Sequence, residues 1–522
     1  MLKGIALKIK APRGTRDLLP EDMEKYRFIE GVLRETFETF GYKEVQTPIF
    51  EKFELFALRS GDEIRNTMFT FETGEGEMAL RPEMTAPICR MIAEGKINLT
   101  FKPIKLYYIG RCFRYEEPQA GRYREFWQAG VELIGSKEAD ADAELIVLAT
   151  ECLKRIGIME YELILGDVGL LRKILETFNA DYEVQNKILS DIDHTQSLIN
   201  KLTTLSSREK LDKNELLALK RMVYSIEERK RRIRARYSKA HDIISEIKPD
   251  TRVYRLNELH TEEIRELVLQ EVEELKKMLI IQWCYEGIRI QDKIYRLPLQ
   301  AGKILLRVLE QLEGDAENVL DKAMDMFKES EEVIKELERL GYIVDLLRSA
   351  GINKVTVNLG LARGLEYYTG VVFEIHFRRL GAQSQICGGG RYDRLISEFG
   401  GPNVPAAGFA FGLDRLVLAL DLQGITPPRR KVRRVLVVPV KEEVRKEAFL
   451  LALRLRREGI QAEMCLAGES LREALFRANK LNIRYVIIVG PKELSRGCIV
   501  LRDMVERLQR EVSLDELPKV IT

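Results

Sequence analysis

Pairs of polar side chains with the spacing of one sheet face recur in the first third of the chain. Glu83 and Thr85 stand two residues apart, and Arg114 and Glu116 repeat this spacing just before a loop that contains proline and glycine. Residues i and i+2 of a strand point to the same side of a sheet, so each pair can present two polar groups to one ligand. A carboxylate beside a hydroxyl could bind an ammonium group. Taken singly, such a pair is more often an ordinary salt bridge or a surface strand.

Further polar groups follow the same logic. Gln128 and Glu132 are four residues apart, so in a strand their side chains also point to the same face of the sheet. Arg363 and Arg415 each stand close to a glycine. Because arginine binds phosphate oxygens through a planar fork and keeps its proton, several arginines converging on one pocket indicate stabilisation of a triphosphate or phosphoryl group. For any single arginine the alternative is a structural ion pair.

Three consecutive glycines precede Arg391, Tyr392 and Asp393 and follow a predicted strand. Glycine lets the backbone approach a ligand closely, but it also suits a tight bulged turn, and the sequence leaves both open. The third glycine of the dinucleotide fingerprint is absent.

Composition limits the chemistry that this chain can perform. Its 522 residues are 45% hydrophobic and 32% charged, with a formal net charge of +2, as in an ordinary globular protein of several domains. No apolar run reaches the roughly 18 residues of a membrane span, so we expect no membrane association. The four histidines are not spaced as metal ligands, and the seven cysteines include no CxxC pair. We therefore expect a cytoplasmic protein without a metal site of its own histidine or cysteine.

The elements that must position the polar pairs are strands of a mixed sheet. An amphipathic helix is predicted from Pro20 to about Phe40, where Gly41 stops it. Two long antiparallel strands are predicted at 105–115 and 124–134. Shorter β-rich segments are predicted at 44–50, 68–72, 78–81, 354–377 and 384–387.

The middle of the chain is charged and helical. Apolar residues between Leu216 and Ile247 recur at nearly 3.5-residue spacing, which Lys230 interrupts, and a second helix at 262–281 could pair with this one as a coiled-coil hairpin. The basic run 227–236 lies on this arm. Its exposed charges either face solvent or contact nucleic-acid phosphates.

The last ninety residues alternate strand and helix. Strands at 435–440, 461–466 and 485–489 with helices between them predict βαβ units and a mainly parallel sheet. Residues 431–522 carry 19 Lys and Arg against 13 Asp and Glu, which points to a polyanionic partner. The sequence thus predicts an α+β domain with a mixed, mainly antiparallel sheet (1–166 and 351–423), a helical insertion domain (167–350) and a C-terminal α/β domain (431–522).

Together these segments resemble histidyl-tRNA synthetases, which are class II aminoacyl-tRNA synthetases. The resemblance covers roughly 11–166 and 297–512. Residues 41–48 resemble motif 1 of that class, 111–132 motif 2 with its loop, and 408–416 motif 3. Residues 363–370 and 387–393 resemble the two histidine-specific signatures. The resemblance implies a homodimer, a class II catalytic domain and a C-terminal anticodon-binding domain.

The resemblance also implies a role for each matching side chain. The substrates would be L-histidine, ATP with Mg²⁺, and histidine tRNA. Catalysis would rest on two arginines at the α-phosphate, Arg114 and Arg363. The ATP-binding residues would be Arg114, Glu116, Arg122, Phe126 and Arg415. The histidine-binding residues would be Glu83, Thr85, Gln128, Glu132, Arg363, Tyr367 and Tyr368. Gln119 would meet the tRNA acceptor end.

The chain departs from the family pattern at three places. Glu366 replaces the usual Asp beside Arg363, Glu117 stands where many bacterial members have Arg, and the insertion is longer than in bacterial members. The motif 2 loop meets the acceptor end, so Glu117 bears on how the acceptor stem is read.

Two alternatives accompany this interpretation. A non-catalytic paralog of the same fold resembles the regulatory subunit of ATP phosphoribosyltransferase, but such paralogs lose the signatures and the terminal domain that this chain retains. A class II synthetase for another amino acid, such as proline or threonine, would not be expected to carry Glu132 with both signatures.

Overall fold

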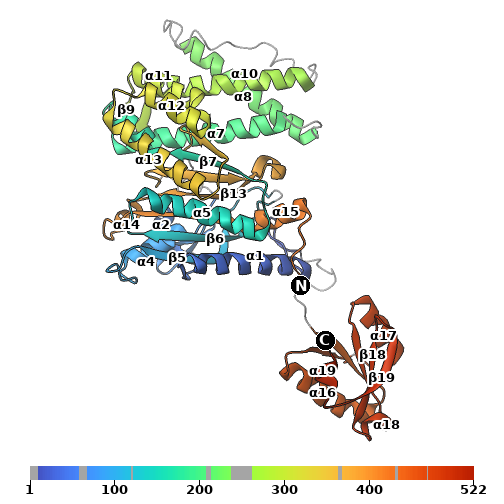
Figure 1. The fold of residues 1–522 in the computed structure, drawn as a ribbon. Coiled ribbons are helices and arrows are strands. Elements are labelled where there is room, and N and C mark those ends of the chain that lie inside the picture. Colours follow the sequence, from blue (N-terminus) through green and yellow to red (C-terminus); the bar gives the residue numbers. More distant parts are fainter. Residues whose placement is uncertain are drawn as a thin grey trace. The chain divides into compact units, whose positions relative to one another are not determined.

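The computed structural model describes residues 10–57, 67–118, 121–206, 213–236, 261–362, 367–428, 433–466 and 468–521. The chain forms two compact units, Met1–Pro427 and Pro428–Thr522 (Figure 1). Among the described residues, no helix is long and apolar enough to cross a membrane.

A nine-stranded mixed sheet organises the first unit (Figure 1), in the order β1-β5-β6-β14-β13-β12-β7-β11-β10. Its strands are β1 (Lys43–Glu44), β5 (Ile104–Phe113), β6 (Glu125–Ile134), β7 (Glu162–Asp167), β10 (Glu313–Asp315), β11 (Val355–Asn358), β12 (Val371–His376), β13 (Gln385–Arg391) and β14 (Ala406–Gly412). Only the pairs β1–β5 and β7–β11 are parallel. The predicted mixed, mainly antiparallel sheet is therefore confirmed.

Helices α1 (Pro20–Thr39), α5 (Ala139–Ile156) and α15 (Leu413–Gln423) pack against this sheet. Helix α1 starts where the sequence predicts it, with proline in its first turn beside Glu21 and Asp22, whose charges favour a helix N-terminus. Its buried Phe37 contacts the rings of Tyr107 and Phe409. Odd-numbered residues of β6 and β14 thus face the α1 core, and even-numbered residues face the opposite side.

A small three-stranded sheet lies beside the large one, in the order β2-β4-β3. Its strands are β2 (Phe50–Lys52), β3 (Thr70–Thr73) and β4 (Gly76–Leu80), with helices α2 (Phe53–Ala57) and α4 (Thr85–Ala93) nearby. The predicted β-rich segments 68–72 and 78–81 correspond to β3 and β4, which pair as an antiparallel hairpin. Arg81, 1% exposed, donates to the carbonyl oxygens of Thr47, Pro48 and Arg111, and so joins this sheet to β5.

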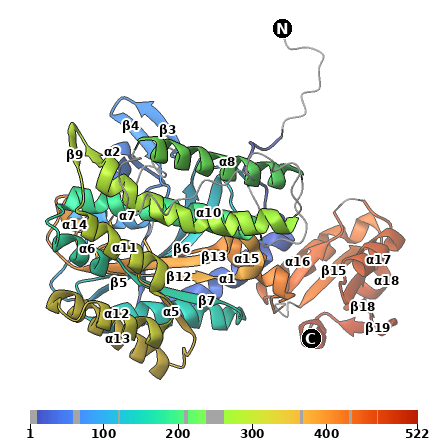
Figure 2. The same ribbon diagram turned by 90° about the horizontal axis from the view of Figure 1, so that it is seen from above.

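The middle of the chain is mainly helical, as predicted. Its helices are α6 (Val168–Glu176), α7 (Tyr182–Ser206), α8 (Lys213–Arg236), α10 (Thr261–Ile281), α11 (Leu299–Gln311), α12 (Ala316–Met326) and α13 (Glu331–Ser349). Helices α7, α8 and α10 lie side by side (Figures 1 and 2). A π-helix (Gln282–Glu286) and a hairpin of β8 (Ile288–Ile290) and β9 (Lys293–Tyr295) follow α10. The later part of the predicted arm, 237–260, lies outside the described residues.

Lys230 does not simply interrupt the apolar pattern of α8. Its side chain is fully buried between α8 and α10, where Nζ lies 2.7 Å from Glu271 and 3.0 Å from Glu227. The neighbouring arginines at 231, 232, 234 and 236 are exposed. The basic run therefore supplies a buried lysine with two ion pairs in the core as well as an exposed charged face.

The second unit contains a five-stranded sheet in the order β16-β15-β17-β18-β19. The elements are β15 (Arg434–Pro439), α16 (Arg445–Arg457), β16 (Gln461–Met464), α17 (Leu471–Lys480), β17 (Tyr485–Val489), α18 (Pro491–Leu494), β18 (Cys498–Asp503), β19 (Leu508–Ser513) and α19 (Leu517–Val520). The three predicted strands pair in parallel, which confirms the α/β class. Strands β18 and β19, which the sequence did not reveal, add an antiparallel half, so the sheet is mixed.

Candidate active site

One face of the large sheet forms the floor of a cavity of about 480 Å³. Glu132 of β6 pairs with Gly408 of β14, which pairs with Gly390 of β13. Directly paired residues share a sheet face, so the Glu132 side chain lies beside two positions that have no side chain. The cavity owes its depth to these small residues.

The glycines leave room for particular atoms. A Cβ at Gly408 would lie 1.9 Å from Glu132 Oε2, and a Cβ at Gly390 would lie 3.0 Å from the Tyr368 ring. The glycine triplet lies within the regular strand β13, and the register irregularity falls instead between Ile375 and His376. Close approach, rather than a bulged turn, therefore explains the glycines.

We expect Gly408→Ala to raise the Michaelis constant of the amino-acid substrate about tenfold, because the methyl group displaces the Glu132 carboxylate by a distance that matters for binding geometry. The Michaelis constant for ATP should stay within about twofold. Gly31→Ala is the matched control, since a Cβ there meets nothing within 4 Å. Unchanged constants in a folded Gly408→Ala protein would show that the carboxylate is not held where the structure places it.

A buried carboxyl group lies beneath the lining of the cavity, next to Thr85. Glu132 is 1% exposed, and it accepts a hydrogen bond from Thr85 Oγ1 at 2.7 Å and another from the Tyr392 hydroxyl. Burial raises the pKa of Glu132 to about 8, and the charge of Glu83 adds to this shift, while the Tyr392 and Thr85 hydrogen bonds oppose it. The group can therefore hold or release a proton near neutral pH.

A second buried acid stands at the start of α4. Glu83 accepts hydrogen bonds from the backbone N–H groups of Thr85 at 2.6 Å and Ala86 at 2.9 Å. A carboxylate at a helix N-terminus is stabilised by these amides. Burial nevertheless raises the pKa of Glu83, although the two amides and the Arg114 charge act against it. Glu83 thus lines this acidic end of the cavity, and Glu132 lies beneath it, bonded to Thr85.

Three tyrosines form the wall above this end. The ring of Tyr367 lies 5.0 Å from that of Tyr368 and 5.6 Å from that of Tyr392. All three side chains are buried, and burial raises the pKa of the Tyr367 and Tyr392 hydroxyls well above the usual range. These hydroxyls therefore stay protonated and can donate hydrogen bonds. Arg363 and Gln119, both predicted site residues, lie outside the described residues.

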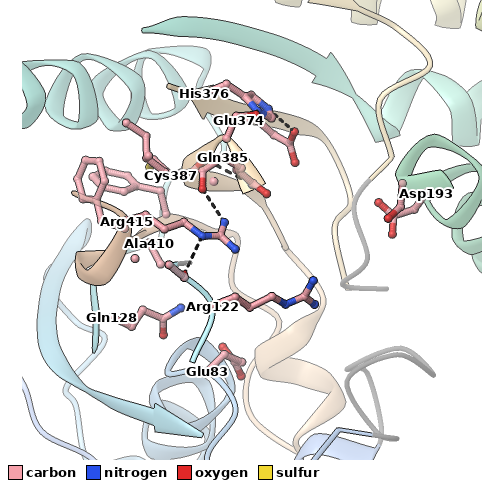
Figure 3. A pocket seen from close by; sticks show the side chains of 18 of the residues that line it. Glu83, Arg122, Gln128, Asp193, Glu374, His376, Gln385, Cys387, Ala410 and Arg415 are labelled. Atoms are coloured by element: carbon pink, nitrogen blue, oxygen red, sulfur yellow. Dashed lines mark hydrogen bonds and ion pairs between the residues drawn. The ribbon is translucent and has the colours of Figure 1, made fainter. Parts of the chain in front are cut away.

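Three arginines line another part of the cavity, the arginine end, and Arg114 lies at its border with Glu83. Arg114 Nε donates to Pro82 O at 2.9 Å, and its guanidinium lies 5.3 Å from the Phe126 ring centroid. Arg415 donates to Gly121 O at 3.3 Å and to Gln385 O at 2.6 Å (Figure 3). Backbone carbonyls thus fix both guanidinium groups.

The arginines repel one another. Burial lowers the pKa of Arg415 to about 10, and the charges of Arg122 and Arg114 lower it further, while Asp414 and Glu374 act in the opposite direction. Arg122 forms an ion pair with Glu116. Positive charges held together in this way favour a bound polyanion, such as a triphosphate.

The structure brings the described site residues of the sequence prediction together. Figure 3 shows Glu83, Arg122, Gln128 and Arg415 around one cavity. The predicted residues that line this cavity are Glu83, Thr85, Arg114, Glu116, Arg122, Phe126, Gln128, Tyr367, Tyr368 and Arg415. Glu132 lies beneath them, bonded to Thr85.

The sequence also matches known families. The family model described as Histidyl-tRNA synthetase matches residues 14–268 and 293–416. The histidine--tRNA ligase of Methanocaldococcus jannaschii is 38% identical over 509 residues, which are 97% of this chain and 98% of that protein. The chain belongs to the histidyl-tRNA synthetase family. The ligase of the same name from Pyrococcus horikoshii is 35% identical over 512 residues, covering 98% of this chain and 97% of that protein.

The remaining comparisons concern the fold and the second unit. The crystal structure of histidyl-tRNA synthetase from Nostoc sp. PCC 7120 superposes with a TM-score of 0.63 at 21% identity, covering 99% of each chain. It therefore supports the fold of this synthetase. A family model described as Anticodon binding domain matches residues 434–522.

Two residues of the synthetase site, Tyr392 and Asp414, were given no role from the sequence. Tyr392 bonds Glu132. Asp414, 4% exposed, accepts hydrogen bonds from the Tyr26 hydroxyl at 2.6 Å and the Trp127 backbone N–H at 2.8 Å, and it forms an ion pair with Arg16. This acid ties the N-terminal segment and α1 to the strand that carries the site. Its position next to Arg415 was the only signal in the sequence.

Two further walls of the cavity come from the middle of the chain and from β12. Helix α7 contributes polar side chains, among them Asp193, Asn200 and Lys201. On β12, His376 bonds Glu374 at 2.9 Å and Ser384 at 3.0 Å (Figure 3). Sequence reasoning missed the α7 residues because nothing local marks a helix face as part of a distant pocket.

The described residues of the site form no protein cage for a metal ion. Within the described ranges, no cluster of three or more His, Cys, Asp or Glu side chains could hold one. A Mg²⁺ ion that enters with ATP would be held mainly by phosphate oxygens and water, as is common for this ion.

Proposed function

We propose that this synthetase activates L-histidine with ATP, giving histidyl-adenylate and pyrophosphate, and then transfers the histidyl group to the 3′ end of histidine tRNA. The observation that carries the proposal is one cavity that is lined by buried Glu83 and by three arginines, with the buried carboxyl of Glu132 beneath it, bonded to the lining residue Thr85. Such a cavity fits an amino acid with a basic side chain beside a nucleoside triphosphate.

Histidine fits the acidic end. Glu83, Thr85 and Gln128 bind its ammonium and carboxylate groups, and Glu132 with Tyr367 and Tyr368 binds its imidazole. The imidazole is a polar ring, so a pocket that hydrogen-bonds it rejects apolar analogues strongly because its own buried groups would then lose their partners. The neighbouring Thr85 hydroxyl orients the Glu132 carboxyl for this contact.

ATP fits the arginine end. Phe126 stacks on the adenine, Glu116 accepts from its amino group once released from Arg122, and Arg415 meets the γ-phosphate. Arg114 holds the α-phosphate, with Arg363 on the opposite side. A carboxylate oxygen of histidine attacks the α-phosphorus in line, the new O–P bond forms, and the bond to pyrophosphate breaks. Mg²⁺ shields the phosphate charge. Positioning and charge neutralisation suffice, and no protein histidine is needed.

The proposal extends to assembly. Motif 1 residues build the dimer interface in this class, and we propose a homodimer here. The large apolar side chains Ile49, Phe50 and Phe71 are 41–53% exposed around motif 1. A patch of this kind favours burial against another protein surface. The seven cysteines are free and most are buried, consistent with the cytoplasm.

We also propose that the domains have separate functions. Residues 1–166 and 351–423 form the catalytic domain, 167–350 form the insertion, and 431–522 bind the anticodon of the tRNA. The positive excess of the last segment fits a surface that contacts phosphates.

Deleting all residues after Gln423 should leave histidine-dependent pyrophosphate exchange within a few-fold of the full chain, while tRNA charging falls by at least about tenfold because phosphate contacts are lost. Both rates are measured on the same dimeric, folded preparation. A parallel loss of both half-reactions would assign the tail to dimer stability instead, and charging at the full-length rate would remove its tRNA role.

The regulatory-subunit alternative makes a different prediction. A regulator would bind histidine without forming an adenylate. Incubation with histidine and α-labelled ATP, followed by separation of the adenylate from the nucleotide, distinguishes the two. We expect stoichiometric adenylate on the full-length chain, and its absence at saturating substrates would favour the regulator.

A further inference from the structure

Arg172 is a buried cation outside the set of residues assigned above. It lies on α6, and its side chain is 6% exposed. Among the described residues it forms no ion pair with a carboxylate, and it donates hydrogen bonds to neutral oxygens. Its Nε has no hydrogen-bond partner. Burial lowers the pKa of Arg172, and the Arg394 charge adds to this effect, while Tyr182 and the more distant charges of Glu176 and Glu398 oppose it. Burying a cation without a carboxylate partner costs free energy, which indicates that Arg172 has a specific role.

The Arg172 guanidinium joins three segments. It donates to Tyr368 O at 3.2 Å in the tyrosine segment, and to Gln185 Oε1 at 3.2 Å and Asn186 Oδ1 at 2.8 Å on α7. It also lies 4.5 Å from the ring centroid of Tyr182, the first residue of α7. One planar group thus links α6, the first two turns of α7 and the backbone of a predicted histidine-binding residue.

The second histidine-specific segment reaches the same ring. Arg394, just after the glycine-rich strand β13, lies 3.8 Å from the Tyr182 centroid. The two histidine-specific segments are also bonded to each other, since Thr369 N donates to Arg391 O at 2.8 Å and Asp393 N donates to Thr369 Oγ1 at 3.0 Å. The start of α7 is therefore a junction for both segments.

Helix α7 continues from this junction to the cavity. Its later turns carry Asp193, Gln196, Ser197, Asn200 and Lys201, which line the cavity wall. A helix of 25 residues is a stiff connector, so its first turn and its cavity-lining turns keep a fixed separation.

We propose that Arg172 is a positioning residue for the amino-acid substrate: it holds the backbone at Tyr368, and with it the tyrosine wall, in register with helix α7. The inference rests on the proposed function, in which this wall binds the imidazole of histidine. Arg172 does not touch the substrate. It acts through the Tyr368 carbonyl, so its removal affects the histidine end of the cavity and leaves the arginine end intact.

The test compares Arg172→Met and Arg172→Lys with the full-length parent. We expect Arg172→Met to raise the Michaelis constant for histidine about tenfold in pyrophosphate exchange, with that for ATP within about twofold, because a small displacement of a binding wall costs about this much. Arg172→Lys should recover part of the loss, since an ammonium group can still donate to Tyr368 O but cannot bridge to α7 in the same plane. Calorimetric histidine binding without ATP should weaken in the same order.

A matched control separates positioning from general stability. Arg348→Met removes a half-buried arginine of α13 that is paired with Glu317 and lies outside the cavity lining. It should leave both Michaelis constants unchanged. If Arg172→Met does not fold, Arg172→Lys carries the test alone.

Unchanged histidine binding in folded Arg172→Lys and Arg172→Met would overturn the inference, and so would an equal rise in both Michaelis constants. Failure of the parent chain to bind histidine or exchange pyrophosphate would instead overturn the proposed function on which the inference rests.

Discussion

Replacing Arg114 with alanine is expected to slow histidine-dependent pyrophosphate exchange about 10²–10³-fold, the usual loss when one preorganised donor to developing charge is removed. The guanidinium is held before substrate arrives, by Pro82 O on one side and by the Phe126 ring nearby. The loss should appear in kcat more than in the Michaelis constant for histidine. Arg114→Lys should retain the charge but not the planar fork, so its exchange rate should lie between those of the parent and of Arg114→Ala.

Arg111→Ala is the matched control for this substitution. Arg111 lies on the same strand, is half exposed, and pairs with Glu125 at 2.6 Å on the surface. Exposed pairs contribute little, so exchange should stay within about twofold. Exchange at the parental rate in a folded Arg114→Ala protein would show that Arg114 takes no part in the reaction.

The second large effect concerns Glu132 and pH. The pKa of this carboxyl is about 8 in the ligand-free pocket, whereas a free imidazole titrates near 6.5. A neutral imidazole can always donate its N–H to a carboxylate, but the contact is strongest when the pair also holds one ionisable proton, on the carboxyl or on the imidazole. Between these two values the pair holds that one proton; below about 6.5 each partner holds one and a proton must leave, and above about 8 the extra proton is lost and the contact weakens. We therefore expect a bell-shaped pH dependence of kcat/KM for histidine between these limits.

Glu132→Gln tests the assignment of the alkaline limb. The amide cannot ionise, so the limb near pH 8 should move to the higher pH at which the α-ammonium of free histidine deprotonates. At neutral pH, kcat/KM for histidine should fall about 10²-fold, because the amide cannot share an ionisable proton with the imidazole and the charge-assisted hydrogen bond is lost. The Michaelis constant for ATP serves as the internal control. A limb that remains at pH 8 in Glu132→Gln would assign it to another group.

Much of the fold follows from local pattern. Helix α1 begins at the predicted proline because Pro20 and the acids after it suit a helix N-terminus. The β5–β6 pair was visible because two long β-rich runs flank a loop with proline and glycine. The parallel half of the C-terminal sheet was visible for a similar reason, the regular alternation of strand and helix.

Other features depend on contacts that no local pattern records. Strand β19 is mostly exposed and carries charged residues, so it lacks the apolar alternation that predicts a strand. Lys230 interrupts a heptad-like pattern, but its partner Glu271 lies on another helix. Gly408 is required because the Glu132 carboxyl of the neighbouring strand occupies the space of its side chain. Each case needs knowledge of which strands and helices become neighbours.

The central claim is that one cavity selects histidine at its acidic end and activates it with ATP at its arginine end. ATP–pyrophosphate exchange by the full-length chain, measured separately with each of the twenty amino acids at neutral pH, tests this most directly. We expect exchange with histidine alone. Exchange with another amino acid, or with none, would contradict it.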